Sequence, residues 1–114
     1  MSKRSYKLSE ISDFLGGQLF GDGSKTVSNI KPLIEADKGS ISFIYNNKFK
    51  KDLKETSASA VLISEEYTKD CSVDYILVSN PHISYAKLTQ LFAQDLRDKI
   101  SKENHANSHA ENDI

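Results

Sequence analysis

The segment ASAVLI at residues 58–63 decides the fold class of this chain, because it ends in an unbroken run of apolar side chains. A strand that is apolar on both faces is typical of a parallel sheet with helices on both sides. The segment YILV at residues 75–78 repeats the pattern, and Asn80 and Pro81 follow it as the N-cap and the first residue of a helix. We therefore predict an α/β fold in which helices pack on a small mixed, mostly parallel sheet.

The segments on either side of these two strands extend the same architecture. Residues 40–44 predict a strand, and Asn46 is expected to cap a helix that carries Phe49 and Leu53 on one face. The helix that starts at Pro81 is predicted to bury a broad apolar stripe. That stripe consists of Ile83, Ala86, Leu88, Leu91, Phe92 and Leu96.

The N-terminal third of the chain predicts shorter elements. Residues 5–8 predict a strand, and Ser9 is expected to cap a helix that ends before a pair of glycines. Residues 18–20 and 26–30 predict two more strands, and the Gly-Asp-Gly at residues 21–23 predicts a hairpin turn between them. That tripeptide lacks the other glycines of a dinucleotide fingerprint and the Lys-Ser/Thr of a P-loop, so it does not indicate a phosphate loop.

Composition limits the functions that the chain can have. Its 114 residues carry 15 basic and 16 acidic side chains, so it lacks the basic excess expected of a nucleic-acid-binding protein. No apolar run approaches the roughly 20 residues that cross a bilayer. The single cysteine, Cys71, excludes an internal disulfide. We therefore expect a cytoplasmic protein with no nucleic-acid partner and no transmembrane segment.

The sequence divides into a domain and a tail. Residues 1–99 contain nearly all the apolar side chains and can form one modest core. Residues 100–114 are almost wholly polar and have too few apolar groups to offset the entropy cost of ordering their backbone. We predict a single domain over residues 1–99 and a polar linker over residues 100–114.

Catalytic and metal-binding patterns are not evident. His105 and His109 have the spacing of two metal ligands on one helix face, but a third ligand is missing and the polar segment favours a linker. His82 falls in the first turn of a predicted helix, where the dipole disfavours its cationic form, and is interpreted as a neutral surface histidine. Cys71 has no neighbour that would activate its thiol. We predict no catalytic residue, no metal site and no cofactor in this chain.

The stretch SFIYNNKF at residues 42–49 carries the candidate binding site, because it passes from the end of a strand into the start of a helix, where ligands collect in α/β sheets. Phe43 and Phe49 offer two aromatic faces for a planar heterocycle, and the amide of Asn46 both donates and accepts, which suits the edge of uracil. Lys48 adds a cation near any phosphate. The alternative is that both phenylalanines belong to the core and that Asn46 only caps the helix.

The order of these motifs resembles the N-terminal domain of the UDP-3-O-acylglucosamine N-acyltransferases, enzymes of lipid A biosynthesis in Gram-negative bacteria. The resemblance covers residues 6–8, 21–23, 30–36, 39–43, 46–49, 58–63 and 80–81. It implies a nucleotide-recognition module in which uracil stacks between Phe43 and Phe49 and contacts Asn46. The family usually has tyrosine at the position of Phe49, so the ring face is kept here and a hydroxyl contact is lost.

The resemblance also implies that catalysis takes place in another domain. In the family, a left-handed β-helix follows the N-terminal domain, forms a homotrimer and carries a histidine general base. That base activates the amine of UDP-3-O-acylglucosamine for attack on a 3-hydroxyacyl chain carried by acyl carrier protein. This chain shows no hexapeptide repeats, so we expect a monomeric recognition domain that is inactive alone, with residues 100–114 leading toward the absent β-helix. His109 is not the expected catalytic histidine.

Two alternatives from other classes remain open. The N-terminal modules of Mur ligases also handle UDP-linked substrates, and a P-loop ATPase motif further along the protein would identify them. A ligand-free protein-interaction domain would instead bury Phe43 and Phe49 in its core.

Overall fold

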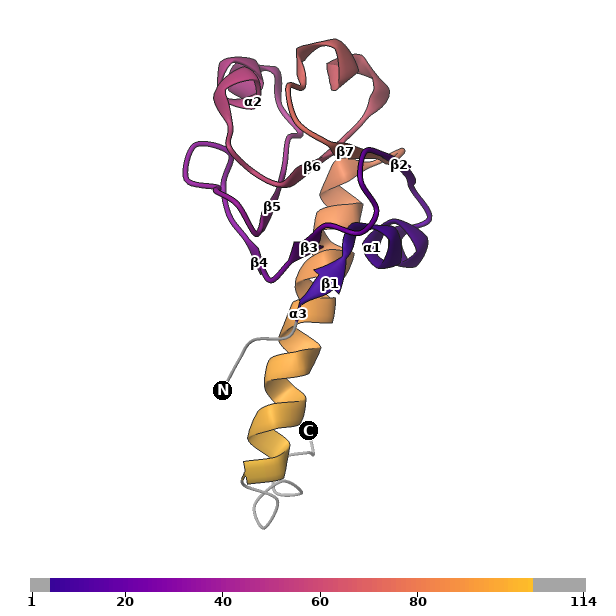
Figure 1. Ribbon diagram of the computed structural model, residues 1–114, viewed down its shortest axis with the longest axis vertical. Coiled ribbons are helices and arrows are strands. Elements are labelled where there is room, and N and C mark those ends of the chain that lie inside the picture. Colours follow the sequence, from indigo (N-terminus) through magenta and orange to yellow (C-terminus); the bar gives the residue numbers. More distant parts are fainter. Residues whose placement is uncertain (1–4, 104–114) are drawn as a thin grey trace.

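The structure of the chain, a computed structural model, describes residues 5–103, with side chains as far as Ala93 (Figure 1). The elements follow the order β1 (Tyr6–Lys7), α1 (Leu8–Leu15), β2 (Gln18–Phe20), β3 (Thr26–Val27), β4 (Asn29–Ile30), β5 (Ser40–Phe43), η1 (Asn47–Phe49), α2 (Lys50–Glu55), β6 (Ala60–Ile63), η2 (Glu65–Asp70), β7 (Tyr75–Leu77) and α3 (Pro81–Glu103).

The main sheet has five strands in the order β2-β7-β6-β5-β4. Strands β4, β5, β6 and β7 run parallel to one another, and β2 pairs with β7 in the antiparallel direction. All four residues of the central strand β6 are buried, as the apolar run at residues 60–63 predicts. The predicted α/β fold with a mixed, mostly parallel sheet is therefore confirmed.

Alternating side chains of β6 build two cores, one on each face of the sheet. Leu62 belongs to a cluster with α1 and α3, which includes Ile11 and Leu88. Val61 and Ile63 belong to a second cluster with α2 and η2 on the opposite face. Figure 1 shows this sandwich, with α1 and α3 together on one side of the strands and α2 on the other. Both faces of β6 therefore lie in a core, which explains why its sequence does not alternate.

The hairpin predicted around residues 21–23 is wrong. Strand β2 pairs with β7, so that Gln18 lies opposite Leu77, and β3 pairs with β1 in a separate two-stranded sheet. The loop between β2 and β3 instead caps α1. Its carbonyls at Gly23 and Lys25 accept hydrogen bonds from the backbone N–H groups of Ser9 (3.2 Å) and Leu8 (2.9 Å). The loop thus supplies partners that a freestanding helix end lacks.

The predicted cap at Ser9 is wrong for the same reason. The N-cap is Lys7, two residues before the predicted one, so helix α1 begins at Leu8, and the N–H groups of Leu8 and Ser9 already have carbonyl partners in the loop. The Glu10 carboxylate completes the start of the helix by accepting a hydrogen bond from the Lys7 backbone N–H at 2.9 Å. The C-terminal end follows the prediction, since Gly16 adopts φ +70° as the C-cap.

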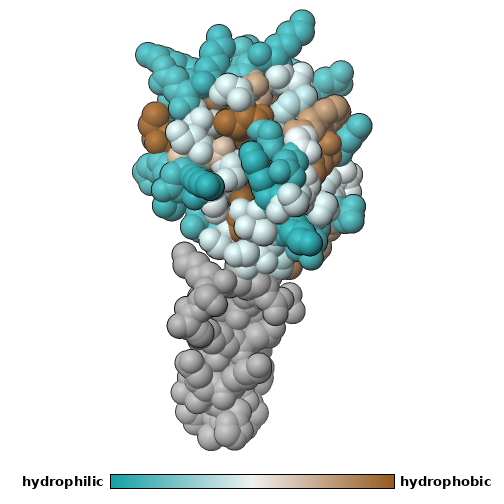
Figure 2. All heavy atoms as spheres, in the orientation of Figure 1, coloured by the Kyte–Doolittle hydropathy of each residue, from teal (hydrophilic) through white to brown (hydrophobic). Residues whose placement is uncertain are grey.

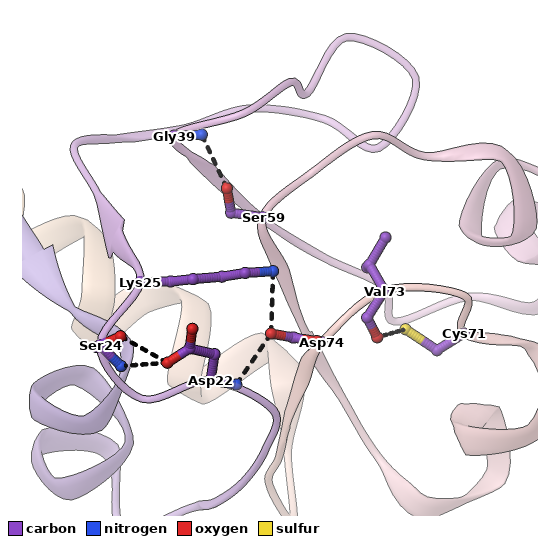
Figure 3. A network of polar contacts seen from close by, with 8 residues as sticks. All are labelled: Asp22, Ser24, Lys25, Gly39, Ser59, Cys71, Val73 and Asp74. Atoms are coloured by element: carbon purple, nitrogen blue, oxygen red, sulfur yellow. Dashed lines mark hydrogen bonds and ion pairs between the residues drawn. The ribbon is translucent and has the colours of Figure 1, made fainter.

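Asp74, just before β7, holds the loop between β2 and β3 in place. Its carboxylate accepts a hydrogen bond from the Asp22 backbone N–H (3.1 Å) and lies 3.0 Å from the Lys25 ammonium (Figure 3). The backbone at Gly21, where φ is +150°, passes so close that a Cβ there would collide with the Asp74 carboxylate. The hydrogen bond from Asp22, followed by the Lys25 charge, lowers the pKa of Asp74 below its usual value.

We expect Asp74→Asn to lower the free energy of unfolding by about 1 kcal/mol at neutral pH, because it removes a charge-assisted hydrogen bond and an ion pair at a partly exposed site. The folded-state pKa of Asp74 is depressed, so its contribution is complete above the unfolded-state pKa and disappears as the pH falls through the folded-state pKa. Urea denaturation of both proteins between neutral and strongly acidic pH should show the difference vanishing in acid. Glu35→Gln, at an exposed carboxylate, should show no such loss, and a pH-independent difference for Asp74→Asn would contradict this account.

Helix α3 begins as predicted. The Asn80 side-chain oxygen accepts hydrogen bonds from the backbone N–H groups of His82 (3.0 Å) and Ile83 (3.2 Å). The predicted buried stripe is partly wrong: Ser84 and Leu88 are buried, whereas Ile83 is 56% exposed and Ala86 is exposed. The helix is buried along the line of residues 84 and 88, because that line faces the sheet. Leu91 and Phe92 are partly buried as predicted, and the Leu96 side chain lies outside the described part.

The C-terminal half of α3 extends away from the sheet (Figure 1). The helix continues to Glu103 and thus passes the boundary predicted at residue 100, while residues 104–114 lie outside the described residues. The division into domain and linker therefore stays a prediction. None of the helices in the described part of the chain has both the length and the apolar character that crossing a bilayer requires.

Candidate functional site

The candidate site residues lie at and just after the carboxyl end of strand β5. Phe43 is its last residue, and Asn46 follows as the N-cap of η1. The Asn46 side-chain oxygen accepts a hydrogen bond from the Lys48 backbone N–H at 3.0 Å, as the capping prediction requires. Its amide NH₂ group is exposed and has no partner among the described residues, so it remains available as a donor.

The rings at this edge form one aromatic group, consisting of Phe43, Tyr45, Phe49, His82 and Tyr85. Phe43 stacks on Tyr85 of α3 at 4.1 Å between centroids and lies parallel to Tyr45 at 5.6 Å. Tyr45 also contacts Phe49 at 6.3 Å and His82 at 5.2 Å. Within this group Phe43 and Phe49 each contact Tyr45 and are not in ring contact with each other. Tyr45 is thus the shared neighbour of both predicted ring faces.

Lys48 places a positive charge beside the aromatic group, and Lys51 carries another in the first turn of α2. The Lys48 ammonium lies 5.3 Å from the centroid of the Phe49 ring, a cation–π distance. Lys50 and Lys54 both pair with Asp70, whereas Lys48 and Lys51 have no carboxylate partner among the described residues. Figure 2 shows hydrophilic side chains gathered over the end of the molecule that carries α2. Lys48 therefore offers a cation to an anion near the Phe49 ring.

A polar hollow of about 270 Å³ lies next to the aromatic group. It is lined by Tyr45 after β5, by Ser64, Glu66 and Tyr67 after β6, and by residues 79–82 after β7. These three strands are parallel neighbours, so their carboxyl ends meet at one edge of the sheet, where α/β proteins bind ligands. We refer to this feature as the polar hollow.

The other sequence candidates do not form a second site. Cys71 is half-buried, its thiol donates a hydrogen bond to the Val73 carbonyl at 3.3 Å, and burial raises its pKa, which disfavours a reactive thiolate. His105 and His109 lie outside the described residues. Within the described part of the chain, no group of three or more His, Cys, Asp or Glu side chains is arranged to hold a metal ion.

Sequence reasoning missed most of the residues around the predicted site. Tyr45 lies inside the stretch 42–49, but no role was predicted for it, although its ring is 50% exposed. No local sequence pattern indicates that Glu66 and Tyr85 belong to the site. They lie near it only because β5, β6 and β7 pair and α3 packs on the sheet. His82 is exposed as predicted, but it belongs to the aromatic group.

Comparisons with known proteins agree on one family. A family model described as UDP-3-O-(3-hydroxymyristoyl) glucosamine N-acyltransferase, LpxD, matches residues 24–91. A UDP-3-O-acylglucosamine N-acyltransferase of Pseudoalteromonas translucida is 40% identical over 88 residues, covering 77% of this chain and 26% of the relative. A relative of the same name from Hahella chejuensis is 39% identical, and the match covers 78% of this chain and 26% of the relative. One from Francisella tularensis subsp. holarctica is also 39% identical, and the match covers 81% of this chain and 27% of the relative. The chain spans about a quarter of the length of the curated relatives that it matches.

Proposed function

The chain belongs to the UDP-3-O-acylglucosamine N-acyltransferase family, and from this premise we propose that it is the region of such an enzyme that recognises the uridine nucleotide of a UDP-sugar. The observation that carries the proposal is the aromatic group at the end of β5, next to the free amide of Asn46 and the unpaired ammonium of Lys48.

The aromatic group supports stacking of a planar base. Phe43 is held by Tyr85 from behind, and Phe49 is packed against the second core, so both predicted ring faces have fixed supports. We propose that uracil stacks on Phe43 and Phe49 while the Asn46 NH₂ donates to a uracil carbonyl. Because Tyr45 now contacts both rings, the base must share this space with Tyr45 or displace its side chain.

Lys48 supports the placement of the phosphates. Its ammonium lies over the Phe49 ring and is exposed, so it can reach an anion attached to a base on that ring. Lys51 adds a second cation from α2 that no described carboxylate neutralises. We propose that the diphosphate runs along this lysine side of the site, where its charge is attracted rather than repelled.

We propose that the acyl transfer itself is carried out by the part of the enzyme that this chain does not cover. In that reaction a 3-hydroxyacyl chain passes from acyl carrier protein to the glucosamine amine of UDP-3-O-acylglucosamine. The full-length enzyme is a cytoplasmic homotrimer in this proposal, and the present chain is a monomeric recognition domain without transferase activity. The chain covers about a quarter of each relative's length, which agrees with catalysis by another part of the enzyme.

The proposal is tested by titrating the ¹⁵N-labelled chain with UMP and following its amide resonances by NMR. We expect the resonances of Phe43, Asn46, Lys48 and Phe49 to shift and saturate, and AMP to cause smaller shifts because adenine has no carbonyl to accept a hydrogen bond from the Asn46 NH₂ group. Shifts confined to α1 and β1 at millimolar UMP, or no shift at all, would overturn the proposal. The second outcome would favour the ligand-free interaction domain.

A further inference from the structure

The proposed base and phosphate contacts leave the polar hollow without a role. Its volume of about 270 Å³ is just below the roughly 300–1,000 Å³ of sites that enclose a whole small molecule. The hollow therefore has the size for one part of a larger ligand. Tyr45 connects it with the aromatic group, because the same ring forms a wall of the hollow and lies parallel to Phe43 at 5.6 Å.

The charge of the lining selects the kind of group that the hollow can accept. None of its eight described lining residues is lysine or arginine, and Glu66 contributes a carboxylate. A phosphate placed there would meet a like charge, which is unfavourable. Hydroxyl groups, in contrast, donate charge-assisted hydrogen bonds to a carboxylate. Close to Glu66 the lining thus favours hydroxyl groups over an anion.

The hydrogen-bonding groups of the lining are partly unused. The Ser64 hydroxyl donates to Glu66 Oε1 at 2.8 Å, which leaves Oε2 without a partner among the described residues. Asn80 uses its side-chain oxygen to cap α3, and its NH₂ group has no partner within the same residues. Among the groups of the lining, the hollow therefore offers Glu66 Oε2 as a strong acceptor and the Asn80 NH₂ group as a donor to an incoming group.

We propose that the polar hollow binds the ribose of the nucleotide, with the Glu66 carboxylate accepting hydrogen bonds from its 2′- and 3′-hydroxyl groups and the Asn80 amide donating to a sugar oxygen. The inference rests on the proposed function, because the ribose reaches the hollow only when the base lies on the aromatic group. It makes the chain selective for ribonucleotides over deoxyribonucleotides, since a site built to bond a hydroxyl rejects the analogue that lacks it.

The test compares UMP with dUMP, which lacks the 2′-hydroxyl, in titrations of the 114-residue chain followed by NMR. We expect UMP to bind about 10-fold more tightly, the effect of one hydrogen bond to a charged group. Glu66→Ala should weaken UMP binding about 10-fold more than dUMP binding, because dUMP loses only the contact of its 3′-hydroxyl, and this difference removes the preference. Glu65→Ala is the matched control, because it deletes a neighbouring exposed carboxylate that does not line the hollow.

The outcomes separate this inference from the proposed function. The ribose assignment would be overturned if the unmodified chain bound UMP and dUMP equally well. It would also be overturned if Glu66→Ala kept the preference for UMP that Glu65→Ala keeps. Either result would leave uridine recognition intact. Absence of UMP binding at millimolar concentration would overturn both. Glu66→Gln keeps the size of the side chain and removes its charge, so a partial loss of the preference in this variant would support the role of the carboxylate.

Discussion

Leu62→Ala is expected to lower the free energy of unfolding by about 3 kcal/mol, the largest effect that we anticipate for a single substitution. Leu62 is fully buried in the central strand β6, between β5 and β7, and it belongs to the core shared by α1 and α3. Its truncation removes apolar area and leaves a cavity that strands paired on both sides cannot easily close.

Urea denaturation of the purified chain measures this effect. Domains of this size are commonly stable by about 5–15 kcal/mol, so Leu62→Ala should move the midpoint far toward lower urea. Ile34→Ala is a suitable control, because this side chain is 63% exposed. It should change the stability by less than about 0.5 kcal/mol. A similarly small effect of Leu62→Ala would contradict the central place of β6 in the core.

Phe43→Leu is expected to weaken UMP binding by about 1–3 kcal/mol, the range for losing one aromatic stacking partner of a base. Leucine preserves the apolar packing of this half-buried position against Tyr85 but removes the flat ring face. Affinity should therefore fall much more than stability.

NMR titration gives the affinity of this variant, and urea denaturation gives its stability. Phe14→Leu makes the same chemical change at a phenylalanine that is 49% exposed on α1, distant in sequence from the proposed site. It should bind UMP as the unmodified chain does. If Phe43→Leu and Phe14→Leu bind UMP equally well, Phe43 does not stack on the base.

The elements predicted correctly are those with strong local signals. The apolar run of β6 and the Asn80–Pro81 start of α3 specify their conformation through residues next to each other. The hairpin between β2 and β3 was wrong because Gly-Asp-Gly indicates only that the chain turns. The partner of β2 is β7, which a local pattern cannot identify.

The candidate site shows the same limit. The stretch 42–49 holds Phe43, Asn46 and Phe49 together in the sequence, so its position at a strand end could be predicted. The polar hollow could not be predicted, because its lining comes from three segments that only the sheet brings together. The exposure of Ile83 was also missed, since helical spacing defines a face without saying which part of it meets the sheet.

Because Gln18 pairs with Leu77, strand β2 can complete its pairing only after β7 has been synthesised. Synthesis proceeds from the N-terminus, so α1 and β2 leave the ribosome long before their partner strand exists. Closing so long a loop carries an entropy cost before any contact compensates for it, which makes this pairing a slow step of folding. A nascent chain that stops short of β7 lacks the five-stranded sheet and helix α3, and with α3 it lacks Tyr85 and His82 of the aromatic group. The aromatic group can therefore be completed only after α3 has been synthesised.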